Sequence, residues 1–304
     1  MSRTDLIQHH YKFTFKYSSR SGISKLPKYR ACALRSSYWK PGTDYKKKIL
    51  DAVTGLVQSG DVIVVSEKAI STAMGRIVDE SGIKPSLSAE LISKVWMRKV
   101  WAYFLGPLTR LSRRNISRLK SYPLEDGAKH KQLSLFYAGP IDSLKHGSEG
   151  GIDVSNLPYS YACIPLSEPY RIADEIKSYI KRRTGVDVEV MIVDSDKTYS
   201  LFSFHMSSRP SFVKGIKCFS LFAFIFGRIL RLRPRSTPVA VTSNGICAEE
   251  ALQIAAVSNR VRGDGAGKTA WDVAEHFNVG VSQVSWEMLE SIAHYPLVIV
   301  RRVR

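Results

Sequence analysis

The chain has 304 residues, of which 44% are hydrophobic and 24% are charged. These proportions are ordinary for a folded globular protein and argue against disorder. The length is sufficient to bury a sizeable core in one large domain or two small ones. The four cysteines lie far apart in the sequence, which argues against a disulfide scaffold or a cysteine-only zinc site and fits a reducing compartment.

The charge is the unusual feature of the composition. The chain has 45 basic and 27 acidic residues, giving a formal net charge of +18, and such an excess attracts polyanions. No arginine-rich arm, zinc-finger spacing or aromatic RNA-binding signature accompanies it. Solvated helix faces are the simpler interpretation, so we expect neither nucleic acid nor a membrane as a partner. A non-catalytic basic protein that binds nucleic acid or an anionic membrane is the alternative.

Two segments bear on localisation. The first residues, MSRTDLIQHHYKF, lack the apolar stretch of a secretory signal. Residues 219–226 are very apolar, but Lys217 and Arg228 flank a run that is about half as long as a membrane span. We therefore expect a cytoplasmic protein, in which this run forms a buried helix or a contact between subunits.

The first half of the chain predicts the following elements. Residues 1–28 form a polar N-terminal segment, and residues 29–304 form the folded domain. Apolar spacing predicts a helix over residues 46–58, and the β-branched run at residues 62–65 predicts a buried strand. Helices at 88–104 and 108–122, broken at Gly106-Pro107, form a basic helical insertion over residues 84–122.

The second half alternates between strands and helices. We predict strands at residues 132–138, 186–193, 238–242 and 296–303, and helices at 168–183, 248–261 and 269–277. Residues 145–158 are polar and glycine-rich and predict a loop. The strand at 186–193 is expected to end abruptly at Asp194. The fold class is therefore α+β or mixed α/β, a sheet with interleaved helices, whose strand order the pattern does not give.

Acidic residues stand at the ends of several predicted elements. Asp153 lies in the glycine-rich loop, Asp194 ends a strand, and Glu249 and Glu250 open a helix. Mg²⁺ and Mn²⁺ prefer hard oxygen ligands, commonly one or two carboxylates plus substrate phosphates. Taken singly, each acid is better explained as a turn residue, a helix cap or a carboxylate favoured by the helix dipole.

Three segments together resemble a known family. They are GDVIVVSEKAISTAMGRIVDE at residues 60–80, EGGIDVSN at residues 149–156 and VMIVDSDKTY at residues 190–199. Their sequences and order are similar to those of the ligases that add glutamate to the deazaflavin coenzyme F-420. The helix AEEALQIAA is a weaker match to a later helix of that family. The resemblance covers roughly residues 30–260, and the fold it implies is that of the F-420 gamma-glutamyl ligases.

The resemblance implies roles for particular residues. Asp153 and Asp194 would bind a divalent metal, and Ser195 would bind a second one, completed by Glu250 or, in a shifted register, Glu249. The residues implied at the nucleotide are Asn156, Glu67, Lys68 and Ser71. No catalytic residue separate from the metal site is implied.

The resemblance also implies a reaction. Relatives use GTP and Mg²⁺ or Mn²⁺ to phosphorylate the carboxylate of the deazaflavin precursor, and the amine of L-glutamate then displaces phosphate from the acyl phosphate. Relatives form homodimers, so a homodimer is expected here. Positioning and charge neutralisation dominate such chemistry.

The chain departs from the family at two places. Relatives have a lysine shortly before the Gly-Arg pair, where this chain has Thr72, and we expect Lys68 to lie on a different part of the turn. The relatives' N-terminal Gly-Leu-Pro loop is replaced by residues 33–39, with Arg30 and Arg35 as candidate phosphate partners. A paralogue with the same metal-nucleotide site and a different acid as substrate is therefore an alternative.

Residues 263–269, GDGAGKT, look like a phosphate-binding loop. The spacing of the P-loop motif fails, because Arg262 stands five residues before Gly267. We predict a turn between two helices, with Lys268 approaching a phosphate as the alternative.

Overall fold

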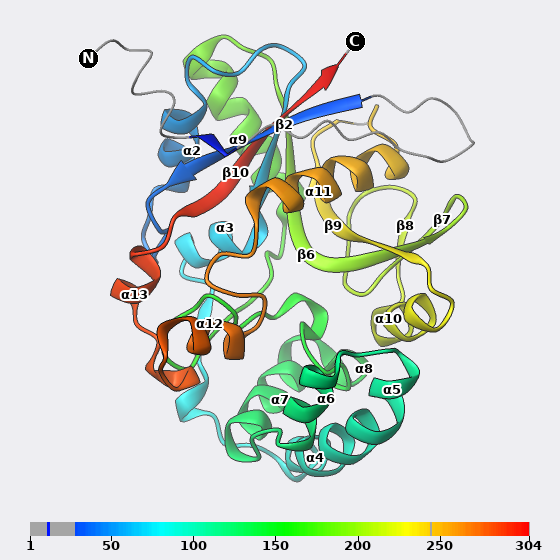
Figure 1. Cartoon of the computed structure of the whole chain (residues 1–304). Coiled ribbons are helices and arrows are strands. Elements are labelled where there is room, and N and C mark those ends of the chain that lie inside the picture. Colours follow the sequence, from blue (N-terminus) through cyan, green and yellow to red (C-terminus); the bar gives the residue numbers. More distant parts are fainter. Residues whose placement is uncertain (1–10, 13–27, 244, 304) are drawn as a thin grey trace.

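The strands of the computed structural model form one mixed sheet and one small antiparallel pair, and helices cover both faces of the large sheet (Figure 1). The structure describes residues 11–12, 28–243 and 245–303. In that part of the chain, the large sheet has the order β1-β2-β10-β3-β6-β7-β8, and β9 also pairs with β6. Its strands are β1 Tyr11–Lys12, β2 Lys28–Ser36, β3 Val62–Ser66, β6 Glu189–Leu201, β7 Phe204–Ser207, β8 Ile216–Cys218, β9 Arg233–Val241 and β10 His294–Val303.

The helices follow the predicted interleaving with the strands. The small pair consists of β4 Ile77–Asp79 and β5 Tyr161–Cys163. The helices are α2 Tyr45–Val53, α3 Glu67–Ala73, α4 Leu87–Leu91, α5 Gly106–Leu108, α6 Arg113–Lys120, α7 Glu125–Tyr137, α8 Gly139–Ser143, α9 Pro169–Thr184, α10 Ser220–Ile229, α11 Ala248–Arg262, α12 Ala270–Phe277 and α13 Trp286–Glu290. Three short helical segments have tighter turns than an α-helix: η1 Glu80–Gly82, η3 Glu149–Gly151 and η4 Val281–Gln283. A fourth segment, η2 Ile92–Leu105, has wider turns. The predicted class, mixed α and β, is confirmed.

The central strand β3 explains why the sheet is covered on both sides. Ile63 and Val65 pack with α2, α3 and α9 in one core, while Val62 and Val64 pack with α11 in another. Successive side chains of a strand point to opposite faces, so a fully apolar strand requires a layer on each face. The predicted strand at 62–65 and the predicted helices at 46–58, 168–183, 248–261 and 269–277 are confirmed within a few residues, as are the strands at 238–242 and 296–303.

The predicted strand at residues 132–138 is wrong, because this segment is the second half of helix α7. Aromatic and apolar residues favour a strand locally. The buried positions of α7, however, follow the spacing of one helix face: they are Gly127, Ala128, Lys131, Leu133 and Ser134. Packing decides the conformation here, and Phe136 is left 78% exposed.

The predicted break at Gly106-Pro107 is also wrong. The wide helical turns of η2 continue directly into α5, and the chain leaves the helix only after Thr109. Pro107 has no N–H to donate, and the helical hydrogen bonds resume beyond it, where the Thr109 N–H donates to the Leu105 carbonyl. Gly106 is required by close approach, since an added Cβ would lie 2.6 Å from the carbonyl oxygen of Trp101.

Strand β6 does not end at Asp194, as predicted, but continues to Leu201. Its pairing with β9 is interrupted between Asp194 and Lys197, where the register shifts. Such a bulge locally redirects side chains, and bulges are common beside functional sites. The expected end of the strand is therefore an irregularity within it, at the position that the sequence singled out.

Helices α4 to α8 gather in a layer at one end of the sheet (Figure 1). This layer is joined to the glycine-rich loop by a buried charged network around Glu149, which is 1% exposed. Lys131 of α7 forms an ion pair with one oxygen of Glu149, and His130 lies 3.1 Å from the other and 2.6 Å from Glu80. Burial alone would lower the pKa of His130, but the two carboxylates raise it to about 10.

The remaining expectations concern the apolar run and the N-terminus. Residues 219–226 lie largely in α10, where Leu221 and Ala223 are buried but Phe222 and Phe226 are about half exposed. In the described part of the chain, no helix is both long and apolar enough to cross a membrane. Apart from β1 and Lys28, the predicted polar segment 1–28 lies outside the described residues.

We predict that Glu149→Gln destabilises the protein by about 3–5 kcal/mol, because it leaves the buried Lys131 ammonium without its counter-charge. Urea unfolding measures this change. Glu125→Gln is the matched control: Glu125 is 83% exposed and pairs only with Lys129, so less than about 0.5 kcal/mol is expected. Equal effects of the two substitutions would contradict a structural role for the network.

The same network predicts a pH dependence. The pKa of His130 rises from 6.5 to about 10 in the folded state, so its contribution to stability is complete below pH 6.5 and is lost as the pH rises through 10. The difference in unfolding free energy between the protein and its His130→Gln variant should therefore shrink between pH 7 and pH 10.5. A constant difference over that range would contradict the charge of the imidazole.

Candidate functional site

A cavity of about 390 Å³ opens at one end of the central strands. Strand β3 ends there, β6 passes it at Asp194, and β10 begins there with His294. Its volume falls in the range of small-molecule sites. Ligands of open α/β sheets bind beyond the carboxyl ends of parallel strands, and β3 and β6 pair in parallel at this end of the sheet.

The cavity is lined by apolar and aromatic side chains, here called its apolar side, and by charged ones, its charged side. The first group comes from the loop after β2, from α13 and the loop after it, and from the start of β10: Tyr38, Trp39, Leu289, Ile292, His294 and Pro296. Burial lowers the pKa of His294 to about 4, so its imidazole is neutral at neutral pH. The charged side consists of Lys68, Lys197, Arg262 and Lys268, with Asp194 and Asp264.

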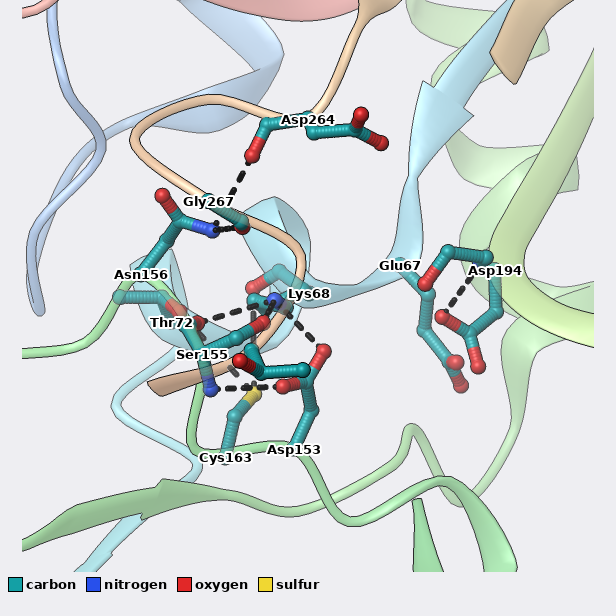
Figure 2. Close-up of polar contacts among 12 residues, drawn as sticks. Glu67, Lys68, Thr72, Asp153, Ser155, Asn156, Cys163, Asp194, Asp264 and Gly267 are labelled. Atoms are coloured by element: carbon teal, nitrogen blue, oxygen red, sulfur yellow. Dashed lines mark hydrogen bonds and ion pairs between the residues drawn. The ribbon is translucent and has the colours of Figure 1, made fainter. Parts of the chain in front are cut away.

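Asp153 and Lys68 form the first polar cluster at the cavity. The Lys68 Nζ lies 2.6 Å from Asp153 Oδ2 and donates to the hydroxyl and carbonyl oxygens of Ser155 at 2.8 and 3.0 Å (Figure 2). The other oxygen of Asp153 accepts the Ser155 N–H. An ammonium thus stands at the carboxylate that the family resemblance assigns to a metal.

Asp194, Glu67 and Arg209 form the second cluster, and Figure 2 shows Glu67 and Asp194 apart from the pair of Lys68 and Asp153. The Arg209 guanidinium lies 2.6 Å from Asp194 and forms an ion pair with both oxygens of Glu67. Burial would raise the pKa of Asp194, but Arg209 outweighs it and holds that pKa below its usual value. Burial raises the pKa of Glu67.

The glycine-rich loop is packed against Arg209. A Cβ on Gly151 would lie 2.7 Å from the guanidinium carbon, and the residue has φ +98°. Only glycine meets both conditions without strain. The second glycine of the GGIDVSN segment is therefore explained by packing on Arg209, and Asp153 follows two residues later.

Asp196, two residues after Asp194 in the bulge of β6, is also buried. Burial, together with the charge of Asp194, raises its pKa to about 7. One of its oxygens has no hydrogen-bond partner in the described part of the chain. The bulge therefore places Asp194 at the cavity and holds Asp196 in a buried position, 3.8 Å from the Lys145 ammonium.

Glu250 and Glu249 do not lie at this cavity. Glu250 accepts a hydrogen bond from Tyr29, which pairs with Arg302 at the far end of β10. At about 3.3 Å per strand residue, that position is roughly 26 Å from the start of β10. Glu249 is bound to Arg235 at 2.6 Å. The arrangement of this chain does not bring either glutamate to an ion shared with Asp194, because the end of α11 that reaches the cavity is its last turn.

The predicted nucleotide residues have different positions. Lys68 and Asn156 line the cavity, whereas Glu67 and Ser71 do not. Ser71 is fully buried in α3 and Glu67 is bound to Arg209. The side-chain amide of Asn156 donates to the carbonyl of Gly267 at 2.8 Å and accepts from the amide of Ala266 at 2.8 Å. Asn156 therefore holds the 264–267 loop at the cavity.

The residues at which the chain departs from the family do not all lie where the sequence predicts. Lys68 and Thr72 are four residues apart on α3, and both line the cavity. The expectation that Lys68 lies on a different part of the turn is wrong, because residues i and i+4 share a helix face. Arg30 and Arg35 lie on β2 and do not line the cavity. The predicted turn at residues 263–269 is confirmed between α11 and α12.

Sequence reasoning missed the cations that organise the site. Arg209 lies in the stretch Ser-Ser-Arg-Pro-Ser, which contains no motif or periodicity. Nothing in this stretch predicts that its side chain is only 2% exposed. Lys197 follows the acidic segment and Arg262 ends a helix. Their importance arises from contacts between distant elements, for which one sequence holds no signal.

The donor set partly fits a divalent metal. In the described part of the chain, no three His, Cys, Asp or Glu side chains are grouped closely enough to hold an ion by themselves. Mg²⁺, however, commonly takes one or two carboxylates together with water and substrate phosphates. Asp194 and Ser195 line the cavity, and Asp153 lies behind the ammonium of Lys68. These hard oxygens fit an ion that is shared with a ligand.

A cavity at strand ends, with an ionised acid and several cations, is the arrangement of a site for an anionic ligand. The sequence model of the F-420-0:gamma-glutamyl ligase family matches residues 33–269, and the chain belongs to this family of ligases. An uncharacterized protein of Methanocaldococcus jannaschii is 34% identical over 285 residues, which cover 90% of this chain and 96% of that protein. A coenzyme F-420:L-glutamate ligase of Methanopyrus kandleri is 23% identical over 162 residues, 51% of this chain and 55% of the ligase.

We predict that Gly151→Ala destabilises the protein by roughly 2–4 kcal/mol, because its Cβ meets the buried guanidinium and its φ is positive. Thermal or urea unfolding measures the loss. Gly147→Ala, in the same loop with open space around the added Cβ, should change the stability by less than about 0.5 kcal/mol. Two equally mild effects would show that the loop does not need its contact with Arg209.

Proposed function

We propose that this protein is a GTP- and divalent-metal-dependent ligase that joins L-glutamate to the carboxylate of a deazaflavin precursor of coenzyme F-420. Family membership supports the ligase class. The observation that carries the proposal is the cavity itself, where the ionised Asp194 and several cations meet beside an apolar wall. An apolar wall suits the base of a nucleotide, and the charged side suits its phosphates.

The proposed chemistry has two steps. A carboxylate oxygen of the acceptor attacks the terminal phosphorus of GTP, and GDP leaves, giving an acyl phosphate. The α-amine of L-glutamate then attacks the acyl carbon, inorganic phosphate leaves, and the amine loses a proton to water. Phosphoryl transfer needs mainly alignment and charge neutralisation. In this proposal, Lys68 neutralises charge on the phosphates, and the apolar wall limits the entry of water.

Asp194 and Ser195 would hold the metal, with Asp153 joining them when Lys68 turns from its carboxylate toward a phosphate. A bound Mg²⁺ or Mn²⁺ would supply charge neutralisation at the phosphate oxygens. Glu250 has no part in this site, given its place at the other end of β10. The buried guanidinium of Arg209 partly neutralises the Asp194 carboxylate. This partial neutralisation favours a metal ion that is also bound by the phosphates of the ligand.

The homodimer implied by the resemblance is likewise a proposal. Helix α10 exposes Phe222 and Phe226, whose rings stack, and Phe219 lies just before the helix. An exposed aromatic group of this kind is a candidate contact between subunits. Sedimentation velocity measures the oligomeric state directly.

A second candidate keeps the same site but gives it another acid. Thr72 replaces the lysine expected from relatives, and the named ligase matches only about half of this chain, whereas the relative that matches most of it is uncharacterized. In this case GTP and metal bind as proposed, and the glutamate adduct forms on a different carboxylate.

The test incubates the protein with GTP, Mn²⁺, L-glutamate and the deazaflavin precursor and looks for a glutamate-sized mass increase. We expect the adduct, and we expect Asp194→Asn to reduce its rate roughly a hundredfold or more, because the acid beside Ser195 on the cavity wall loses its charge. Asp51→Asn, an exposed acid on α2, is the control and should keep full activity.

Calorimetry with GTP and Mn²⁺ keeps the result interpretable if Asp194→Asn folds poorly. Binding without an adduct would favour the second candidate. Absence of binding, together with the same signal for the protein and its Asp153→Asn variant, would reject both and favour a non-catalytic basic protein.

A further inference from the structure

Arg262, the last residue of α11, lines the cavity with a guanidinium group that lacks a full set of partners. Its Nη2 donates to the side chain of Asn259 at 3.1 Å. Its Nη1 is buried and has no hydrogen-bond partner in the described part of the chain. Among the described residues, no carboxylate lies within ion-pair distance of it. A buried donor without a partner is costly to the fold.

The nearby acids are already engaged with other cations. Asp194 is bound by Arg209, Asp153 by Lys68, and Asp264 lies 3.7 Å from Lys268. These three acids act on Arg262 only from a distance, and burial lowers its pKa. The C-terminal end of α11 offers it some stabilisation through the helix dipole, but this effect is small. The guanidinium therefore has capacity for an external anion.

Two more cations face the same space. Lys197, from the bulge of β6, lines the cavity and makes no ion pair among the described residues. Lys268, from the loop after α11, lines it as well and is 75% exposed. Three cations from three separate elements thus line the same cavity.

The 264–267 loop, which separates Arg262 from Lys268, is held in place. The side chain of Asn156 forms hydrogen bonds with two adjacent residues of this loop, Ala266 and Gly267. A Cβ on Gly265 would lie 2.8 Å from the Asn156 oxygen, and φ there is +63°. The loop therefore has one close-fitting arrangement against Asn156. Cations on a fixed edge bind an anion without the entropic cost of ordering a loop.

We propose that Arg262, together with Lys197 and Lys268, forms a subsite for phosphate groups at the cavity. A guanidinium binds phosphate oxygens through paired N–H donors, and lysines add point charge. A single carboxylate would leave most of this charge unbalanced, whereas a chain of phosphates matches it. The subsite deepens the proposed function by assigning phosphate binding to residues that the family resemblance did not indicate, and its test does not require glutamate transfer.

The test measures binding of inorganic tripolyphosphate to the full-length protein by calorimetry, without metal. We expect saturable binding, weakened roughly tenfold or more by Arg262→Gln, because charge-assisted hydrogen bonds are lost. Arg113→Gln removes the same charge from an exposed position on α6, and its affinity should stay within about twofold of the unchanged protein. Lys197→Gln should weaken binding as well.

Thermal unfolding separates a ligand-binding role from a structural one. Without tripolyphosphate, Arg262→Gln should unfold at the same temperature as the protein or higher, because a buried donor without a partner is removed. With tripolyphosphate, the protein should gain more in Tm than the variant. A variant that is destabilised without anion and still binds tripolyphosphate normally would overturn the subsite, as would absence of binding to the unchanged protein.

Competition identifies where the phosphate comes from. Displacement of tripolyphosphate by GTP assigns the subsite to the nucleotide, and displacement by the phosphodiester-bearing acceptor alone assigns it to the acceptor. The subsite and the ligase proposal also fail separately. Loss of tripolyphosphate binding in Arg262→Gln without any glutamate adduct supports the subsite and rejects the ligase, whereas an adduct with unchanged anion binding in Arg262→Gln does the reverse.

Discussion

The buried guanidinium of Arg209 is the interaction on which the site depends. It joins Glu67 at the start of α3 to Asp194 in the bulge of β6, and it fills the space beside Gly151. Two carboxylates buried side by side would otherwise repel each other and be protonated. With Arg209 between them, the pKa of Asp194 stays low, so a negative charge persists at the cavity. The helix, the strand and the glycine-rich loop are positioned by the same cation.

Much of the fold follows from local patterns in the sequence. The run Val62 to Val65 predicts a strand buried on both faces, and the apolar spacing of α9 and α11 predicts helices, because these elements satisfy their patterns alone. Helix α7 does not: its face includes Lys131 and Ser134, which look exposed in sequence but are buried. They are buried because Glu149, eighteen residues away, supplies the counter-charge for Lys131. A pattern that depends on a distant partner is invisible within one segment.

The residues of the candidate site show the same distinction between local patterns and contacts with distant partners. The resemblance brings attention to Asp153, Asp194, Lys68 and Asn156, and these residues do lie around one region, because each follows or precedes a strand or helix end there. It fails to locate Glu250, since a helical pattern gives no information on which end of α11 meets the cavity. The last turn of that helix, with Asn259 and Arg262, reaches it instead. Residues such as Arg209 and Lys197 are identified only from the folded structure. It shows which charged side chains are buried and which have no ion-pair partner among the described residues.

The electrostatics of the cavity has two separate halves. On one side, carboxylates are already balanced by Arg209 and Lys68, whereas on the other, Arg262 and Lys197 have no matching acid among the described residues. The loop that carries Asp153 is held by the helical layer through Glu149 and by Arg209 through Gly151. The cationic half is held by Asn156 and the 264–267 loop. Asn156, however, belongs to the same glycine-rich loop as Asp153. That loop therefore couples the two groups of charges, and a change in the helical layer that moves it acts on both of them.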